Sequence, residues 1–400
     1  MTAAASLFRA HNHDLPMMEP VIRAAVERGA SDIHIKAGDF VRARVTGRLM
    51  PLTRQKLTPE QARAFALTVL PNDRVRAQVD SLQDYDCSWG IDGLTRFRVN
   101  VMRQRGSFNI ILRVIPYDVP TLEALGLPPV LATIAEAERG MILVTGVTGS
   151  GKSSTMAAMI QHMNHQSYRH IVTLEDPIEF LHRDHNCSIS QREIGSDTES
   201  FHKGLRAALR QDPDVIQIGE MRDAETIDIA LKAAETGHLV ISTLHTKDAA
   251  STIARLISAF PSEEQQTIRY RLADALDAVI SQRLLPRRDR KGRVVAAEIM
   301  RSTGAIQDCI REESKTSEIP DYVAAGRDTY HMQTFDQHLA ELVRQGVVDF
   351  GVARAAATNP SDFELQARLS AGGVPGAPAS APESSGGGGA MEGFVSGPGY

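Results

Sequence analysis

The sequence is poor in cysteine and in aromatic residues, and it contains no long apolar run. Its three cysteines, Cys87, Cys187 and Cys309, lie far apart without a Cys-x-x-Cys pair, which argues against a disulfide framework and against a structural zinc site. No segment approaches the roughly 18 to 20 consecutive apolar residues that a membrane-spanning helix needs. The N-terminus also lacks the apolar core of a signal peptide. We therefore expect a cytoplasmic protein with reduced thiols.

The overall charge is slightly negative rather than basic. The 44 Lys and Arg residues are outnumbered by 49 Asp and Glu residues, for a formal net charge of -5. Such a chain generates no overall field that attracts nucleic acid or anionic lipid. Its 400 residues, of which 42% are hydrophobic, are enough for two or three domains with their own cores. We expect a multidomain protein without a nucleic-acid partner.

The chain divides into four parts by composition and pattern. Residues 1–115 combine a helix-like segment with short alternating segments bounded by glycines, which predicts a small α+β domain built on an antiparallel sheet. Several prolines in 116–130 predict an interdomain linker. Residues 131–370 form the second domain, and the Gly-, Ala-, Pro- and Ser-rich composition of 371–400 predicts a disordered tail.

In the second domain, short apolar segments alternate with helical segments, which predicts an α/β fold. The apolar segments span 141–145, 170–174, 215–218 and 239–243. Strands and helices in alternation form a mostly parallel sheet with helices on both faces. Functional residues are then expected where these strands end. Beyond residue 262 the pattern predicts mainly helices and one hairpin, formed by 279–286 and 293–300.

A glycine-rich run at 146–153, GVTGSGKS, directly follows the first of these strands and precedes a helix. This is the pattern of a phosphate-binding P-loop in its expected context. Its glycines let backbone N–H groups surround phosphate oxygens, Lys152 reaches the β and γ oxygens, and Ser153 ligates Mg²⁺. We expect a bound nucleoside triphosphate and Mg²⁺, with contacts from Gly146, Thr148, Gly149, Ser150, Gly151, Lys152, Ser153 and Ser154.

Two acidic segments follow other strands of the predicted sheet. The first contains Glu175 and Glu179, and the second contains Glu220. Hydrolysis of a triphosphate needs a residue that orients the attacking water. Gly219 stands where most P-loop enzymes have an Asp that supports Mg²⁺, so Glu220 is the candidate for positioning water. The alternative interpretation is an acid near a helix N-terminus, stabilised by the helix dipole.

Two histidines flank the strand 239–243. His245 follows the strand and is a candidate sensor of the γ-phosphate. His238 precedes the strand and fits a hydrogen-bonded structural histidine equally well. The two are seven positions apart, so in a continuous strand they would point to opposite faces, which makes them a poor metal pair.

Arginines cluster in the first domain, several of them with like parity on one predicted strand. Phosphoryl transfer benefits from a guanidinium near the leaving charge, which a neighbouring domain or subunit often supplies. The alternative for each of them is a solvated strand face. The cluster consists of Arg96, Arg98, Arg103, Arg105 and Arg113.

In combination, these segments resemble the secretion ATPases, and most closely the type IV pilus retraction ATPase (PilT) family. The segments that carry the resemblance are GVTGSGKSST at 146–155, LEDPIEF at 174–180, IGEMRD at 218–223 and ETGHLVISTLHT at 235–246. The similarity extends over about 15–370. It implies a PAS-like N-terminal domain, a RecA-like ATPase domain with C-terminal helices, and a homo-hexameric ring that hydrolyses ATP with Mg²⁺ to power pilus retraction and twitching motility.

The resemblance also implies roles for individual residues. The atypical Gly219 is a trait of the family rather than a defect. In the family's motifs, Glu220 matches the catalytic Walker B glutamate, Glu175 and Glu179 match Asp box acids, His238 and His245 match the His box, and Arg98 and Arg113 fall where the family has arginine fingers.

One departure from the family pattern keeps alternatives open. Retraction ATPases usually carry an AIRNLIRE motif, of which GAIQDCIRE at 304–312 keeps only the outline. A PilU-like accessory motor therefore remains open, as does a pilus assembly or type II secretion ATPase. Alternatives from other classes are a nucleic-acid translocase and a non-hydrolysing ring subunit. The resemblance implies an inner-membrane platform protein as partner, a paralogous pilus ATPase as a further one, and a location at the inner face of the cytoplasmic membrane.

Overall fold

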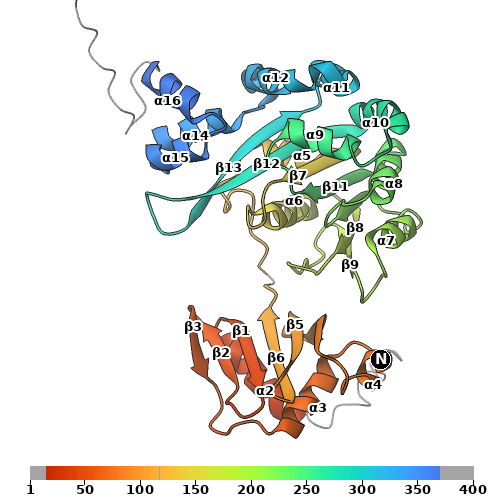
Figure 1. Cartoon of the computed structure of the whole chain (residues 1–400), viewed down its shortest axis with the longest axis vertical. Helices are drawn as coiled ribbons and strands as arrows, with labels where there is room; N and C mark the ends of the chain where they lie inside the picture. The colour runs from red at the N-terminus through yellow and green to blue at the C-terminus, as the bar shows by residue number, and fades with distance from the viewer. Residues whose placement is uncertain (1–14, 117, 370–400) are drawn as a thin grey trace, which may run out of the picture.

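Two β-sheets organise the chain. The structure, a computed structural model, describes residues 15–116 and 118–369, so the tail predicted at 371–400 lies outside the described residues. Figure 1 shows the two sheets in separate parts of the molecule, joined by one connection near 115–129. Among the described residues, no helix has both the length and the apolar character needed to cross a membrane.

The first sheet has six strands in the order β3-β2-β1-β6-β5-β4, and every neighbouring pair is antiparallel. Helices α2 and α3 pack against it over a core that includes Ile22, Phe65 and Phe97. The elements are α2 (Leu15–Glu27), β1 (Ala30–Lys36), β2 (Arg42–Val45), β3 (Arg48–Pro51), α3 (Pro59–Val69), α4 (Asp73–Ala77), β4 (Asp84–Ile91), β5 (Thr95–Gln104) and β6 (Ser107–Val114).

The second sheet has seven strands in the order β13-β12-β7-β11-β10-β8-β9. Only β12 and β13 pair antiparallel, and the other neighbouring pairs are parallel. Its elements are α5 (Val130–Ala135), β7 (Gly140–Thr145), α6 (Lys152–Gln166), β8 (His170–Glu175), β9 (Ser188–Glu193), α7 (Phe201–Ala208), β10 (Val215–Ile218), α8 (Ala224–Glu235), β11 (Leu239–Leu244), α9 (Ala249–Ile257), α10 (Ser262–Ala275), β12 (Leu276–Pro286) and β13 (Arg293–Arg301).

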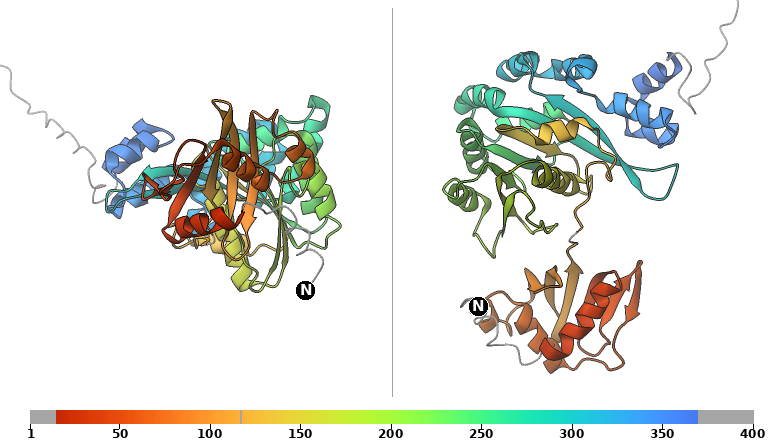
Figure 2. Two further views of the ribbon diagram at one scale, coloured as in Figure 1. Left: turned by 90° about the horizontal axis from the view of Figure 1, so that it is seen from below. Right: turned by 180° about the vertical axis from the view of Figure 1, so that it is seen from behind.

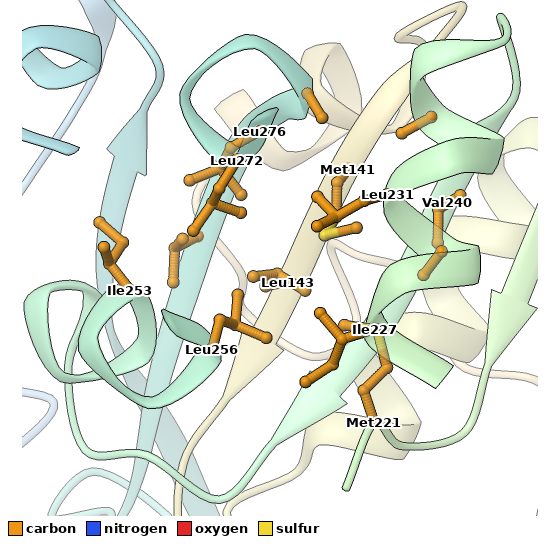
Figure 3. Close-up of a cluster of buried hydrophobic side chains, with 14 of the residues drawn as sticks. Met141, Leu143, Met221, Ile227, Leu231, Val240, Ile253, Leu256, Leu272 and Leu276 are labelled. Atoms are coloured by element: carbon orange, nitrogen blue, oxygen red, sulfur yellow. The ribbon is translucent and has the colours of Figure 1, made fainter. Parts of the chain in front are cut away.

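Helices cover both faces of this second sheet, as the continuous apolar character of its strands predicts. Met141 and Leu143 of β7 belong to a cluster with residues of α8, α9 and α10, which Figure 3 shows in close-up. Ile142 and Val144, which alternate with them, belong to a second cluster with residues of α5 and α6. The central strands are therefore buried on both sides, and most polar groups that can reach a ligand lie at or near their ends.

Short helices follow β13 and complete the described chain. Phe335 and Leu339 pack with Leu285 of β12 and Val294 of β13 in a separate apolar cluster. Figures 1 and 2 show α14–α16 gathered on the side of the molecule toward which the β12–β13 hairpin extends. The elements are α11 (Gly304–Arg311), a 3₁₀ helix (Glu313–Glu318), α12 (Ile319–Ala325), α13 (Arg327–Tyr330), α14 (Phe335–Arg344), α15 (Phe350–Ala356) and α16 (Pro360–Leu369).

The sequence pattern missed several of these elements, among them β4, β9 and α3. Strands β4 and β9 lie at sheet edges and mix charged, polar and apolar residues, so their alternation is weak. Helix α3 has a readable start, because Thr58 and Gln61 form a capping box and Pro59 occupies the first helical position. The buried residues Ala62, Phe65, Ala66 and Val69 also follow the spacing of one helix face, so this helix could have been predicted from the sequence.

Glu298 is a buried carboxyl group in β13, with only 7% of its surface exposed. It accepts a hydrogen bond of 2.8 Å from the backbone N–H of Ala249, at the start of α9. Burial raises its pKa to about 7, and nearby Asp248 and Asp336 act in the same direction. The Ala249 hydrogen bond and Arg283 oppose this rise without cancelling it.

Glu298→Gln should therefore change how stability depends on pH. The raised folded-state pKa means that the protonated form contributes stability that is fully present below pH 4.5 and is lost as the pH rises through about 7. That shift corresponds to about 3 kcal/mol, at about 1.4 kcal/mol per pKa unit. Glutamine still offers an oxygen to Ala249 but does not titrate. Urea unfolding across this pH range should show a flatter stability profile for the variant.

The matched control is Glu123→Gln, which changes an exposed glutamate. Its profile should follow that of the unmodified protein. If Glu298→Gln and Glu123→Gln show the same decline in stability toward neutral pH, Glu298 does not carry the effect.

Candidate functional site

The carboxyl ends of β7, β8, β10 and β11 surround one cavity of about 480 Å³. The four strands pair in parallel, so their ends meet at the same edge of the sheet. This cavity brings together most of the site residues that the sequence predicts. Those that line it are Thr148, Gly149, Gly151, Lys152, Ser153, Ser154, Glu175, Glu179, Glu220 and His245.

The glycine-rich run adopts a backbone that only glycine accommodates easily. Gly146, Gly149 and Gly151 have φ angles of 141°, 77° and 96°. Gly146 also has no room for a side chain, because a Cβ there would lie 2.5 Å from the carbonyl oxygen of Gln282 and 2.6 Å from Ser150 Oγ. Gly146 and Ser150 thus support the loop without lining the cavity. Gly151 begins α6 without a side-chain cap, which leaves the first N–H groups of the helix available for an anion.

Lys152 is 8% exposed, and its ammonium lies within the loop. Nζ donates hydrogen bonds to the carbonyl oxygens of Gly146 at 2.8 Å and Val147 at 3.2 Å. Burial lowers the pKa of Lys152, while the carboxylates of Glu179 and Glu220 oppose that shift. The lysine is therefore a desolvated cation close to two acids, which suits it to contact phosphate oxygens.

Glu175 ends β8 and is 9% exposed. Its Oε1 accepts hydrogen bonds from Thr173 Oγ1 at 2.7 Å and from Gln191 Nε2 at 3.0 Å. Burial raises the pKa of Glu175, and these hydrogen bonds act against the rise. Glu179, four residues later, is exposed on the loop that follows. Glu175 is thus held rigidly, whereas Glu179 extends from the loop at the cavity.

Glu220 lies just beyond β10, and its side chain is 16% exposed. Oε1 lies 2.6 Å from Arg222 Nη2, and Oε2 lies 3.7 Å from His245 Nε2. The turn that carries it is fixed by Thr243, whose Oγ1 donates to the carbonyl oxygen of Gly219 at 2.6 Å. Glu220 is therefore an acid at the cavity wall, in contact with a histidine from the neighbouring strand.

The structure also tests the alternative interpretation of Glu220 as a helix-terminal acid. The N-cap of α8 is Asp223, whose side chain accepts a hydrogen bond of 2.8 Å from the N–H of Thr226. Glu220 precedes this cap by three residues and lines the cavity instead. The geometry favours the functional interpretation.

The residues around Ser153 fit a Mg²⁺ ion of the P-loop type. Such an ion takes one Ser or Thr hydroxyl, phosphate oxygens and water, and needs no cage of protein carboxylates. Ser153 follows Lys152 at the cavity. In the described part of the chain, no group of three or more His, Cys, Asp or Glu side chains could hold a metal ion on its own. The donor set therefore suits a metal that arrives with a nucleotide.

His238 does not reach the cavity. It lies at the opposite end of β11 from His245, about 20 Å away at roughly 3.3 Å per strand residue. Its Nδ1 lies 3.0 Å from the carbonyl oxygen of Ala233. Of the two histidines, only His245 lines the cavity within one chain, and a catalytic role for His238 stays a prediction.

Arg98 and Arg113 also lie outside the cavity of their own chain. They are paired across β5 and β6 in the first sheet, and Arg113 Nε donates to Asp32 Oδ1 at 2.9 Å. Arg98 is exposed. Their assignment as arginine fingers requires a second chain and stays a prediction.

The cavity also contains residues that the sequence reasoning missed. His182 is half-buried, and desolvation of its ring lowers its pKa to about 4. Gln217 could have been noticed in the sequence, because it is the polar residue of the otherwise apolar strand VIQI. The others come from distant segments without a local pattern. Together, these residues include His182, Phe201, Gln217, Leu284 and Arg293.

Comparisons with known proteins agree with this site. A family model described as type II/IV secretion system protein matches residues 11–357. The chain is 43% identical over 339 residues to the type IV pilus retraction ATPase PilT of Pseudomonas aeruginosa, covering 85% of this chain and 97% of that protein. It is 39% identical over 353 residues to the type IV pilus ATPase PilU of the same organism, covering 88% and 91%.

A solved structure gives the same result. The crystal structure of the pilus retraction motor PilT with bound ADP superposes with a TM-score of 0.78 at 42% identity. The match covers 87% of this chain and 99% of that chain. It confirms the mixed α/β fold.

Gly146→Ala should abolish nucleotide binding. The added Cβ would overlap the carbonyl oxygen of Gln282 and the hydroxyl of Ser150, so the loop would have to move. A shift of that kind misaligns the N–H groups that bind phosphate, and we expect affinity for ADP to fall by at least about 100-fold, which is about 2.7 kcal/mol. Calorimetric titration with ADP measures this. Gly304→Ala, at a glycine with open space around its Cβ position, is the control and should bind ADP normally.

Proposed function

Because this chain belongs to the type II/IV secretion system protein family and is an ATP hydrolase, we propose that it is a motor that powers the retraction of type IV pili. One observation carries the proposal: Glu220 lines the same cavity as the P-loop, with Lys152 and His245 as its neighbours. This is the arrangement that hydrolysis of a bound triphosphate requires. The similarity to PilT over nearly its full length supports the assignment to retraction.

Each site residue then has a distinct role in turnover. Backbone N–H groups of 146–153 and the Lys152 ammonium hold the β and γ phosphates of ATP. Ser153 would hold Mg²⁺, which supplies positive charge to the phosphates when bound. Glu220 orients the attacking water, and His245, 3.7 Å from it, senses the γ-phosphate. Glu175 and Glu179 supply further acid groups at the same edge of the sheet.

The fold details belong to the same proposal. The antiparallel sheet of 1–115 is a PAS-like domain, 116–130 is the linker, and 131–370 is a RecA-like ATPase domain with C-terminal helices. Support comes from the parallel sheet with a P-loop after β7 and from the separate antiparallel sheet. Six chains form a ring in which Arg98 or Arg113 of one chain acts at the site of another.

The proposed partners follow from pilus retraction. The ring docks on an inner-membrane platform protein at the cytoplasmic face and acts beside a paralogous pilus ATPase. The similarity of the chain to both PilT and PilU supports a place in such a system. The net charge of -5 offers no basis for a nucleic-acid translocase.

An accessory, PilU-like motor is the second candidate, favoured by the altered motif at 304–312. In α11, Ile306, Cys309 and Ile310 are buried, so the apolar outline of the motif is used for packing. Arg311 pairs with Asp274 at 2.8 Å and with Asp308 at 3.2 Å. The departure from the motif thus changes the polar surface of the helix rather than its core.

Glu220→Gln should separate these candidates. Glutamine keeps the shape of the side chain and removes the acceptor charge, so ATP turnover should fall by about 100-fold or more while ADP binding is retained. Surface pili are then counted by electron microscopy in cells whose chromosomal copy of the protein carries this substitution. A retraction motor predicts excess pili on immobile cells.

The other outcomes of this count are equally specific. Bald cells would contradict retraction and indicate an assembly motor, and an unchanged count would indicate an accessory role. Glu225→Gln, in the first turn of α8, is the matched control and should leave turnover and pilus number unchanged. Full turnover by Glu220→Gln would contradict the catalytic assignment itself.

Mixed rings test the arginine fingers. Arg98→Ala should reduce turnover by about 1,000-fold while nucleotide affinity changes little, because a finger acts on the charge that develops in the transition state. If the finger acts across a subunit boundary, mixing the Arg98→Ala and Glu220→Gln proteins should restore part of the activity. In mixed rings, some interfaces combine an intact Arg98 from one chain with an intact Glu220 from the other. Arg48→Ala, on the exposed β3, is the control. No recovery in mixed rings would count against Arg98, and Arg113 is tested in the same way.

A further inference from the structure

The residue that directly follows strand β10 has no side chain, whereas P-loop enzymes usually have an Asp at this position that supports the metal ion. The position is occupied by Gly219, and the space beside it is filled. A Cβ on Gly219 would lie 3.3 Å from the carbonyl oxygen of Leu174 and 3.4 Å from two ring carbons of Phe201. An aspartate at this position would press against the ring. Another group would then have to accept hydrogen bonds from the water molecules bound to the metal ion.

Gln217 is the nearest polar side chain on the same strand. It is 4% exposed and lines the cavity together with Lys152 and Ser153. Its Oε1 is buried and has no hydrogen-bond partner among the described residues. A buried acceptor without a partner destabilises the fold. A group outside the described chain, such as water or a ligand in the cavity, is therefore needed to donate a hydrogen bond to it.

Other polar groups near Gln217 are already engaged. Thr173, its neighbour in register on β8, donates to Glu175 at 2.7 Å. Thr243, at the end of β11, donates to the carbonyl oxygen of Gly219 at 2.6 Å. Of the residues that line the cavity, only His182 also has a buried polar side-chain atom without a partner in the described chain, and it lies on the loop between β8 and β9.

Gln217 is close to the position of the missing aspartate. It precedes Gly219, the residue that follows β10, by two residues, and it shares a face of β10 with Val215. Val215, two residues earlier on that face, belongs to the cluster that includes residues of α6, the helix that the P-loop opens. The longer side chain of glutamine can lean along the strand toward the carboxyl edge, where Ser153 lies.

We infer that Gln217 is a positioning residue whose carboxamide oxygen accepts a hydrogen bond from water bound to Mg²⁺, in place of the carboxylate that Gly219 lacks. The inference rests on the proposed nucleotide site. Mg²⁺ keeps several waters in protein sites, and outer partners that orient them are worth roughly 10- to 100-fold in metal affinity. Gln217 is therefore a second residue of the proposed metal site, for which the sequence predicted only Ser153 as a ligand.

The test measures metal affinity rather than turnover. Mn²⁺ replaces Mg²⁺ as a spectroscopic probe, and electron paramagnetic resonance titrations follow its binding to the assembled protein with ADP. Gln217→Leu should weaken Mn²⁺ binding by about tenfold. Calorimetric ADP binding in EDTA should be unchanged, because the P-loop contacts remain. Gln217→Glu, which keeps an acceptor oxygen at this position, should hold Mn²⁺ within about threefold of the unmodified protein.

The controls separate a metal role from packing. Gln217→Met keeps the unbranched shape of the side chain and should behave like Gln217→Leu. It replaces the leucine variant in the test if that variant does not fold. Ser242→Ala removes another buried, unpartnered polar group of the sheet, from outside the cavity lining, and should leave Mn²⁺ binding unchanged.

Two results would overturn the inference. One is unchanged Mn²⁺ affinity in Gln217→Leu or Gln217→Met, and the other is an equal loss of ADP affinity in EDTA, which would indicate a packing defect. Failure of the unmodified protein to bind ADP at all would instead refute the proposed nucleotide site.

Discussion

The site depends on the parallel alignment of β7, β8, β10 and β11. Ile218 lies opposite both Leu174 and Ser242, so the residues that follow these strands emerge at one level. A slip of one residue in any pair would turn its side chains to the other face of the sheet. Burial on both faces makes such a slip costly, since apolar residues of every strand contact helices on either side. The apolar clusters therefore hold the catalytic geometry, although none of their residues performs chemistry.

Once the strands are aligned, electrostatics determines what the cavity can bind. Glu175, Glu179 and Glu220 bring negative charge to a partly dehydrated edge, and burial raises the pKa of Glu175. A triphosphate adds more negative charge at the same place. Lys152, the N–H groups at the start of α6 and a metal ion that accompanies the nucleotide offset it. Burial lowers the pKa of Lys152, and the nearby carboxylates of Glu179 and Glu220 act against that shift, so their proximity helps to keep the buried lysine charged.

The sequence revealed the site better than it revealed the first sheet, for a physical reason. A P-loop, an acid after an apolar strand and a histidine after another are local patterns, and parallel pairing alone brings them together. His238 belongs to the same motif as His245, yet strand length separates them. Strand β4 shows no clear alternation because it lies at an edge and is half exposed. Gln217 was visible as a polar residue in an apolar strand, but its unpartnered oxygen appears only after folding. The roles of Arg98 and Arg113 stay predictions, because neither residue lines the cavity of its own chain.

The two sheets are connected by more than the linker. Glu193, at the end of β9 and 3% exposed, accepts a hydrogen bond of 2.7 Å from Ser88 Oγ of β4, and its Oε2 lies 3.6 Å from Arg96 Nη2 of β5. The same Oε2 accepts a hydrogen bond of 3.2 Å from the backbone N–H of Ile178, one residue before Glu179. One buried carboxylate thus joins the first sheet to the acidic loop that lines the cavity. A buried charge that loses its partners is strongly destabilising. Any displacement of the first sheet must therefore either break these contacts together or move the loop that carries Glu179. In both cases, the position of the first sheet is linked to the nucleotide site within a single chain.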